Sequence, residues 1–133
     1  MSKNPFKIYE DIRKENLSPR EMEASVLARA GHMLKQCQAT WDTEGHDKRL
    51  DEALAFNQKV WTFFQGELTQ PDNPLPLELR SNILNLSVFI DKTIFDIMAY
   101  PEPEKLTPVI EIDMNLAAGL LAKPVEVTLE EAV

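Results

Sequence analysis

The sequence predicts an all-α fold: a compact bundle of about four to five helices in one domain, residues 1–124, followed by a short acidic tail, residues 125–133. Apolar residues recur three and four positions apart over long stretches, which is the helical period. Only four of the 133 residues are glycine, and the hairpin pairs Asn-Gly and Asp-Gly do not occur. A chain of this length suits one domain with a single core, and 44% hydrophobic with 27% charged residues is typical of a soluble globular protein.

A short leading helix is expected over residues 4–14. Asn4 suits its N-cap, and Pro5 suits its first helical position, where the N–H that proline lacks has no partner in any case. The apolar stripe of this helix is short and consists of Phe6, Ile8, Tyr9 and Ile12.

The first long helix is expected to begin at Ser18 and to end near Thr40 or Trp41. Ser18 stands at the cap, Pro19 at the first position and Glu21 at the third, which is the pattern of a capping box. A charged loop over residues 42–48 follows. One face of the helix is apolar and comprises Met22, Val26, Leu27, Ala30, Met33, Leu34 and Cys37.

A second helix is expected over residues 48–67, with Phe56 and Phe63 to the side of its inner face. Asn57 is the polar member of that face. Since a buried amide must find a hydrogen-bond partner, Asn57 either fixes helix register or contacts a ligand. Asn82 and Asn85 are possible partners. The inner face comprises Leu50, Ala53, Leu54, Asn57, Val60, Trp61 and Phe64.

The third helix is expected from Pro76 to about Tyr100, after a proline-rich loop over residues 70–76. A second stripe, Leu84, Val88 and Phe95, lies nearly opposite its main one. A helix that is apolar on two sides is either covered on both or has one side that awaits a partner. The main stripe comprises Leu79, Ile83, Leu86, Phe89, Ile90, Ile94 and Ile97.

A fourth helix follows the linker that Pro101-Glu102-Pro103 begins. Thr107-Pro108 provides its cap and first position, and Lys123-Pro124 ends it. The tail over residues 125–133 is expected to be disordered. The apolar positions of the helix are Val109, Ile110, Ile112, Leu116, Ala117, Leu120 and Leu121.

The charge pattern narrows the classes of function. The net charge is −8, and residues 101–133 carry seven acidic and two basic side chains. Without a run of Lys or Arg, direct binding of nucleic acid or of an anionic membrane is disfavoured. The most apolar segment, residues 83–100, contains Asn85, Asp91, Lys92 and Asp96, and residues 1–10 lack an apolar signal core. One cysteine cannot form an internal disulfide, so we expect a cytoplasmic protein.

Residues for catalysis are sparse. The isolated glycines form no phosphate-binding loop. Cys37 and His32 fall on different helical faces, and a metal site from these two with His46 and Asp42 matches no closed zinc pattern. Acidic residues in helix first turns are explained by favourable interaction with the helix dipole. We therefore expect no enzyme, no cofactor and no metal.

Four segments follow Tyr9 in a recognisable order: residues 18–24, 53–61, 73–80 and 83–87. Over about residues 4–121, this order resembles the family of the flagellar biosynthesis regulator FlaF. The most specific signal is Asn57 with Trp61 one turn later, followed by Leu75-Pro76 and then by Asn85-Leu86-Ser87. Residues 110–113 and 117–120 also fit. The chain has Ile112-Asp113-Met114 where the family tends to show Ile-Asn-Arg.

The resemblance implies a bacterial flagellar assembly factor of the cytoplasm that is needed for flagellin production and export. Its expected partner is flagellin, through the terminal segments of that protein. A secretion chaperone would bind such a segment as an amphipathic helix in an apolar groove. The alternative is post-transcriptional regulation of flagellin synthesis, acting with the regulator FlbT or on flagellin messenger RNA.

For partner binding we single out six residues on the second and third helices. The alternative interpretation places them in the core, under the leading and fourth helices. The fourth helix could also cover a groove until a partner arrives. The candidate residues are Asn57, Trp61, Phe63, Leu84, Val88 and Phe95.

Overall fold

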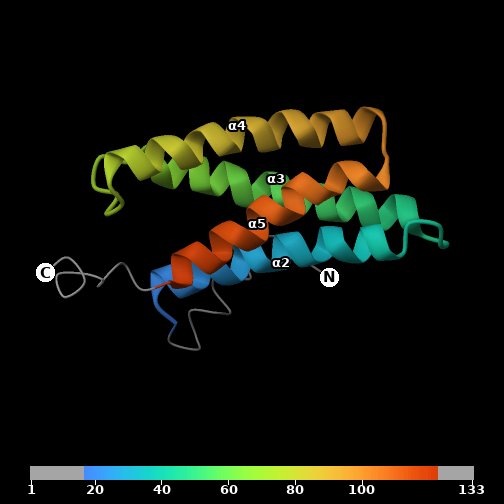
Figure 1. The fold of residues 1–133 in the computed structure, drawn as a ribbon, viewed down its shortest axis with the longest axis horizontal. Coiled ribbons are helices and arrows are strands. Elements are labelled where there is room, and N and C mark those ends of the chain that lie inside the picture. The colour runs from blue at the N-terminus through green and yellow to red at the C-terminus, as the bar shows by residue number, and fades with distance from the viewer. Residues whose placement is uncertain (1–16, 123–133) are drawn as a thin grey trace, which may run out of the picture.

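The computed structural model describes residues 17–122, and over these residues the all-α prediction is confirmed (Figure 1). The expected leading helix, residues 4–14, and the acidic tail, residues 125–133, lie outside the described residues. The elements are α2 (Pro19–Ala39), α3 (His46–Leu68), α4 (Leu77–Ala99), the 3₁₀ turn η1 (Pro103–Lys105) and α5 (Leu106–Leu121).

The four α-helices run alternately up and down, so that each is antiparallel to the next along the chain (Figure 1). The most extensive packing joins α2 and α5, which are far apart in the sequence. Helix α3 packs against α2 on one side and against α4 on the other. Helix α4 lies at the edge of the bundle and touches α5 only slightly. One long side of α4 therefore lies outside the helix-packing contacts of residues 17–122.

The start of α2 is the capping box that the sequence predicts. Ser18 Oγ accepts from the backbone N–H of Glu21 at 3.1 Å, and the N–H of Ser18 donates to Glu21 Oε1 at 2.9 Å. These two bonds satisfy backbone donors that a helix N-terminus otherwise leaves open. Because an ionised carboxylate accepts better, the Ser18 N–H also holds the pKa of Glu21 below its ordinary value.

Helix α3 begins at His46, two residues before the expected start, because Gly45 turns the chain with a φ of +84°. Only glycine adopts this left-handed conformation without strain. The Arg49 guanidinium fixes the turn by donating to Glu44 O at 2.7 Å and Thr40 O at 3.1 Å. The ring of His46 packs against that of Trp41, with centroids 4.0 Å apart and ring planes tilted by 55°.

The expected cap of the last helix is wrong. Helix α5 continues directly from η1 and begins at Leu106, so Thr107 lies inside the helix. Thr107 Oγ1 instead accepts from Gln38 Nε2 of α2 at 2.8 Å, and the same nitrogen donates to Pro103 O at 2.9 Å. A side chain of α2 therefore fixes the start of α5. Because the two helices are far apart in the sequence, no local sequence pattern predicts these bonds.

The core lies between α2, α3 and α5, with α4 covering one side of α3. Trp61 and Phe56 are its largest fully buried side chains. Phe56 was expected beside the inner face of its helix and is instead fully buried, because α3 has α2 on one side and α4 on the other and buries a wide arc.

Candidate partner-binding face

Helix α4 buries only one narrow stripe against the bundle. Ile83, Ile90, Ile94 and Ile97 are buried there, together with Ser87, whose hydroxyl donates to Leu84 O at 2.6 Å. Three members of the expected main stripe do not belong to it: Leu79, Leu86 and Phe89 are 42%, 38% and 46% exposed. The predicted stripe was too wide. An edge helix that packs almost wholly on one neighbour, here α3, buries a smaller part of its circumference than a central helix does.

The second stripe of α4 is open at Val88 and Phe95 but not at Leu84, which packs partly against the core. Val88 is 52% exposed and Phe95 is 64% exposed, while Leu84 is half-buried. Leu77 and Met98 extend the stripe at its two ends, and both are exposed. Successive members are separated by seven, four, seven and three residues, which is the spacing of a heptad seam. We call these five residues the α4 seam.

Two polar residues interrupt the α4 seam, Ser81 and Asp91. Asp91 takes the heptad position between Val88 and Phe95, and its Oδ2 accepts from Gln65 Nε2 of α3 at 3.0 Å. This bond turns the carboxylate toward α3 and fixes the two helices against each other. A helix lying along the seam would meet Asp91 between two apolar contacts.

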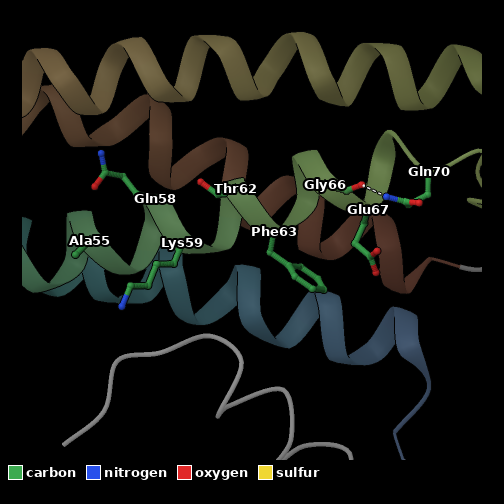
Figure 2. Close-up of a pocket in the computed structure, with 8 residues that line it drawn as sticks. All are labelled: Ala55, Gln58, Lys59, Thr62, Phe63, Gly66, Glu67 and Gln70. Atoms are coloured by element: carbon green, nitrogen blue, oxygen red, sulfur yellow. Dashed lines mark hydrogen bonds between the residues drawn. The ribbon is translucent and has the colours of Figure 1, made fainter.

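Phe63 does not lie on the α4 seam. It lines a shallow hollow of about 550 Å³ on α3, and its side chain extends toward α2 and away from α4 (Figure 2). Its ring also meets Phe64 edge-on, with centroids 5.9 Å apart. The other residues that line the hollow are Ala55, Gln58, Lys59, Thr62, Gly66, Glu67 and Gln70.

Asn57 and Trp61 are fully buried inside the bundle, so the structure separates them from the three candidates on α4. Asn57 Nδ2 donates to Ala30 O of α2 at 3.1 Å and to Ala53 O at 2.9 Å. The bond to Ala30 joins α3 to α2 and fixes their register, which is the structural role that the sequence left open. Asn82 and Asn85, considered as its partners, are both exposed on α4.

Trp61 Nε1 donates to Asp113 Oδ1 of α5 at 2.9 Å, and Asp113 is also fully buried. Burial raises the pKa of Asp113 to about 7, although the bond from Trp61 acts to lower it. Sequence reasoning did not single out this residue. The available signal was its position: Asp113 falls on the same helical stripe as Val109, Ala117 and Leu120.

A second concave surface lies at one end of the bundle. It is a groove of about 700 Å³, mostly apolar, and its charged lining residues are Arg20, Glu23 and Glu67. Burial and the nearby Glu67 raise the pKa of Glu23. Sequence reasoning missed the groove because distant segments form it. Its other lining residues are Ser18, Pro19, Phe64, Leu68, Asn73, Pro74, Leu75, Ile83, Leu116 and Leu120.

The residues considered for chemistry lie apart. Cys37 is buried, and burial raises the pKa of its thiol. His32 is exposed and pairs with Gln36. Over residues 17–122, no three His, Cys, Asp or Glu side chains gather where they could hold a metal ion. None of the helices in this range is long and apolar enough to cross a membrane.

Comparison with known proteins gives one match. The family model described as flagellar protein FlaF matches residues 5–120, which is most of the chain. No curated protein and no solved structure matches. The matched range includes all four α-helices except the last residue of α5.

Proposed function

Since the chain belongs to the FlaF family of flagellar proteins, we propose that it binds flagellin in the cytoplasm and supports the production and export of that protein. It acts by binding, without catalysis and without a cofactor. The observation that supports this proposal best is the α4 seam, a heptad-spaced apolar stripe that residues 17–122 leave open.

The α4 seam suits an amphipathic helix, and the terminal segments of flagellin supply one. A partner helix would place its own apolar stripe between Leu84, Val88 and Phe95, as in helix-in-groove recognition. Burying a Val, Leu or Phe side chain yields about 1.5–3 kcal/mol each. Several such contacts are needed, because a disordered segment must be ordered when it binds.

The polar features of the surface favour a partner over self-association. Asp91 in the middle of the seam would face a polar or basic residue of the bound helix. A second copy of this chain would present its own Asp91 and its own net charge of −8, and like charges oppose association.

The test of the proposal is co-expression with the flagellin of the same organism, followed by size-exclusion chromatography. Phe95→Asp and Val88→Asp place a charge on the seam, and we expect each to weaken flagellin binding at least about tenfold, since loss of a central apolar contact commonly costs more than 1.4 kcal/mol. Phe89→Asp is the matched control. Phe89 is 46% exposed on the same helix but lies off the seam, so this variant should bind flagellin like the wild type.

Two results would overturn the proposal. One is that Phe95→Asp and Val88→Asp, folded normally by circular dichroism, still co-elute with flagellin as the wild type does. The other is that the wild type binds FlbT but never flagellin and that the seam variants lose FlbT, which would favour the alternative in which the chain acts with FlbT. A gel shift with flagellin messenger RNA at two salt concentrations tests the remaining alternative, direct binding to that RNA. Such binding should fall steeply as the salt concentration rises.

A further inference from the structure

Two acceptor atoms in the core receive no hydrogen bond from the described residues. They are Asn57 Oδ1 on α3 and Asp113 Oδ2 on α5, and both side chains are fully buried. Buried polar atoms in folded proteins are almost always paired, because an unpaired one has lost its bonds to water without replacement. Two unpaired acceptors on packed helices therefore require an explanation.

The orientation of the Asn57 amide is fixed by its two bonds. Its nitrogen donates to Ala30 O at 3.1 Å and to Ala53 O at 2.9 Å. Backbone carbonyls can only accept, so the amide nitrogen must point toward them and the amide cannot be flipped. Both amide hydrogens are used in these bonds. The remaining atom, Oδ1, can only accept and needs a donor.

Asp113 reaches the same part of α2 from the opposite helix. Its Cβ lies 3.1 Å from the position that a Cβ on Gly31 would take, and Gly31 is the neighbour of Ala30. Asp113 Oδ1 accepts from Trp61, which lies one turn after Asn57 on α3. Asn57, Trp61 and Asp113 thus converge where α2, α3 and α5 meet, and we call them the buried polar cluster.

Nothing in the described helices compensates a charge on Asp113. Arg29 and Lys35 of α2, Lys59 of α3 and Lys92 of α4 are exposed to solvent, and so is Glu111 of α5 itself. An ionised carboxylate in this position would keep one hydrogen bond, from the neutral Trp61 N–H. Burial of a charge with so little support strongly favours the neutral form.

We propose that Asp113 is protonated in the folded protein and that its Oδ2–H donates to Asn57 Oδ1. One proton then satisfies both unpaired acceptors. It also completes a chain of hydrogen bonds from Trp61 through Asp113 to Asn57 and on to Ala30 of α2. The proton acts as a ligand that holds α5 against α2 and α3.

The consequence is a pH-dependent bundle. Burial raises the pKa of Asp113 in the folded state to about 7, against an ordinary value of 3.8 when the chain is unfolded. The folded state therefore binds the proton more tightly. The contribution of this bound proton to stability is complete below the pKa of Asp113 in the unfolded chain, and it is lost as the pH rises through about 7. The packing of α5 should loosen toward alkaline pH.

The test compares Asp113→Asn with the wild type in urea unfolding of the full chain between pH 5 and pH 8.5. An asparagine imitates the protonated acid: one oxygen accepts from Trp61, and the amide N–H donates to Asn57. We expect the urea midpoint of the wild type to fall across this range. The midpoint of Asp113→Asn should stay level and exceed that of the wild type at pH 8.5. Asp72→Asn, an exposed change in the α3–α4 loop, should follow the wild type.

The proposal is overturned if Asp113→Asn shows the pH dependence of the wild type, or if it is the less stable of the two at pH 8.5. A second measurement needs no variant. The carboxyl ¹³C resonance of Asp113 in the wild type should titrate with a midpoint near 7. A midpoint at or below 3.8 would mean an ionised carboxylate whose Oδ2 is bonded to water, and it would refute the proposal.

Discussion

Gly31 sets the distance between α2 and α5. A Cβ at this position would lie 2.9 Å from Met114 Sδ and 3.1 Å from Asp113 Cβ. The thioether of Met114 is partly exposed and can move aside. Asp113 Cβ cannot, because it is attached to the backbone of a packed helix and its carboxyl is bonded to Trp61. The buried polar cluster therefore depends on a glycine in the opposite helix.

Gly31→Ala should separate the two helices at this point, whereas Gly119→Ala should not. Among residues 17–122, nothing lies within 4 Å of a Cβ at Gly119, so that change gains helix propensity and stabilises by up to about 1 kcal/mol. Overpacking at Gly31 should make Gly31→Ala less stable than Gly119→Ala by about 1–3 kcal/mol. Urea unfolding of both variants measures the difference. Equal stabilities would show that the contact at Gly31 is not tight.

At the scale of single residues, the sequence predicted apolar burial better than polar burial. Asn57 could be recognised as a buried amide because it interrupts an apolar face. Asp113 was not singled out, since a carboxylate among apolar residues is ordinarily placed on the exposed side of a helix. Its acceptor role depends on Trp61, 52 positions away. No spacing rule within one helix predicts such a pair.

Among the elements, α2 has the best-defined start, because Ser18 and Glu21 bond each other's backbone. Ser18→Ala removes the side-chain acceptor and should destabilise the protein by about 0.5–2 kcal/mol. The free energy of unfolding from urea titration measures this loss. Ser81→Ala is the matched control, since Ser81 is exposed within α4 and its replacement should change stability by less than about 0.5 kcal/mol. A Ser18→Ala variant as stable as the control would contradict a working cap.

The sequence predicted a helix start where a neighbouring side chain forms the cap. The start of α2 was predicted from the capping box. The start of α5 was not, since Gln38 of another helix binds Thr107, the expected cap, and also Pro103 O. The two apolar stripes of α4 show the same difference between what local sequence determines and what helix packing determines. Periodicity identified both apolar sides of α4, but only the packing of α3 decided which side is buried.

For the whole molecule, the arrangement of the helices separates stability from the proposed binding. The core of α2, α3 and α5 contains the buried polar cluster, while α4 at the edge presents the seam. Substitutions at exposed positions of α4 can therefore change recognition without opening the core. A compact helical domain was predictable from the sequence. The separation of the core from the exposed seam of α4 was not predictable, because it depends on which helix lies outermost.

Removing α5 tests whether the stabilising core and the proposed binding surface are separate parts of the molecule. We considered that the last helix covers a groove and leaves when a partner arrives, which would make it dispensable for folding. In the structure it contributes Leu106, Val109, Ile110 and Leu120 to the core and the acceptor for Trp61. At about 1.5–3 kcal/mol for each large apolar side chain, its loss would remove as much as a typical domain's whole stability of about 5–15 kcal/mol.

A chain that ends at residue 105 should therefore fail to unfold cooperatively in urea, and its near-ultraviolet circular dichroism should lack the signal of a packed Trp61. A chain that ends at residue 122 keeps α5 and should unfold cooperatively. If the chain ending at 105 were cooperative and bound flagellin more tightly, α5 would be a removable cover. If it is unfolded, loss of binding says nothing about the binding surface. The seam variants of α4, which leave the core intact, are then the changes that locate it.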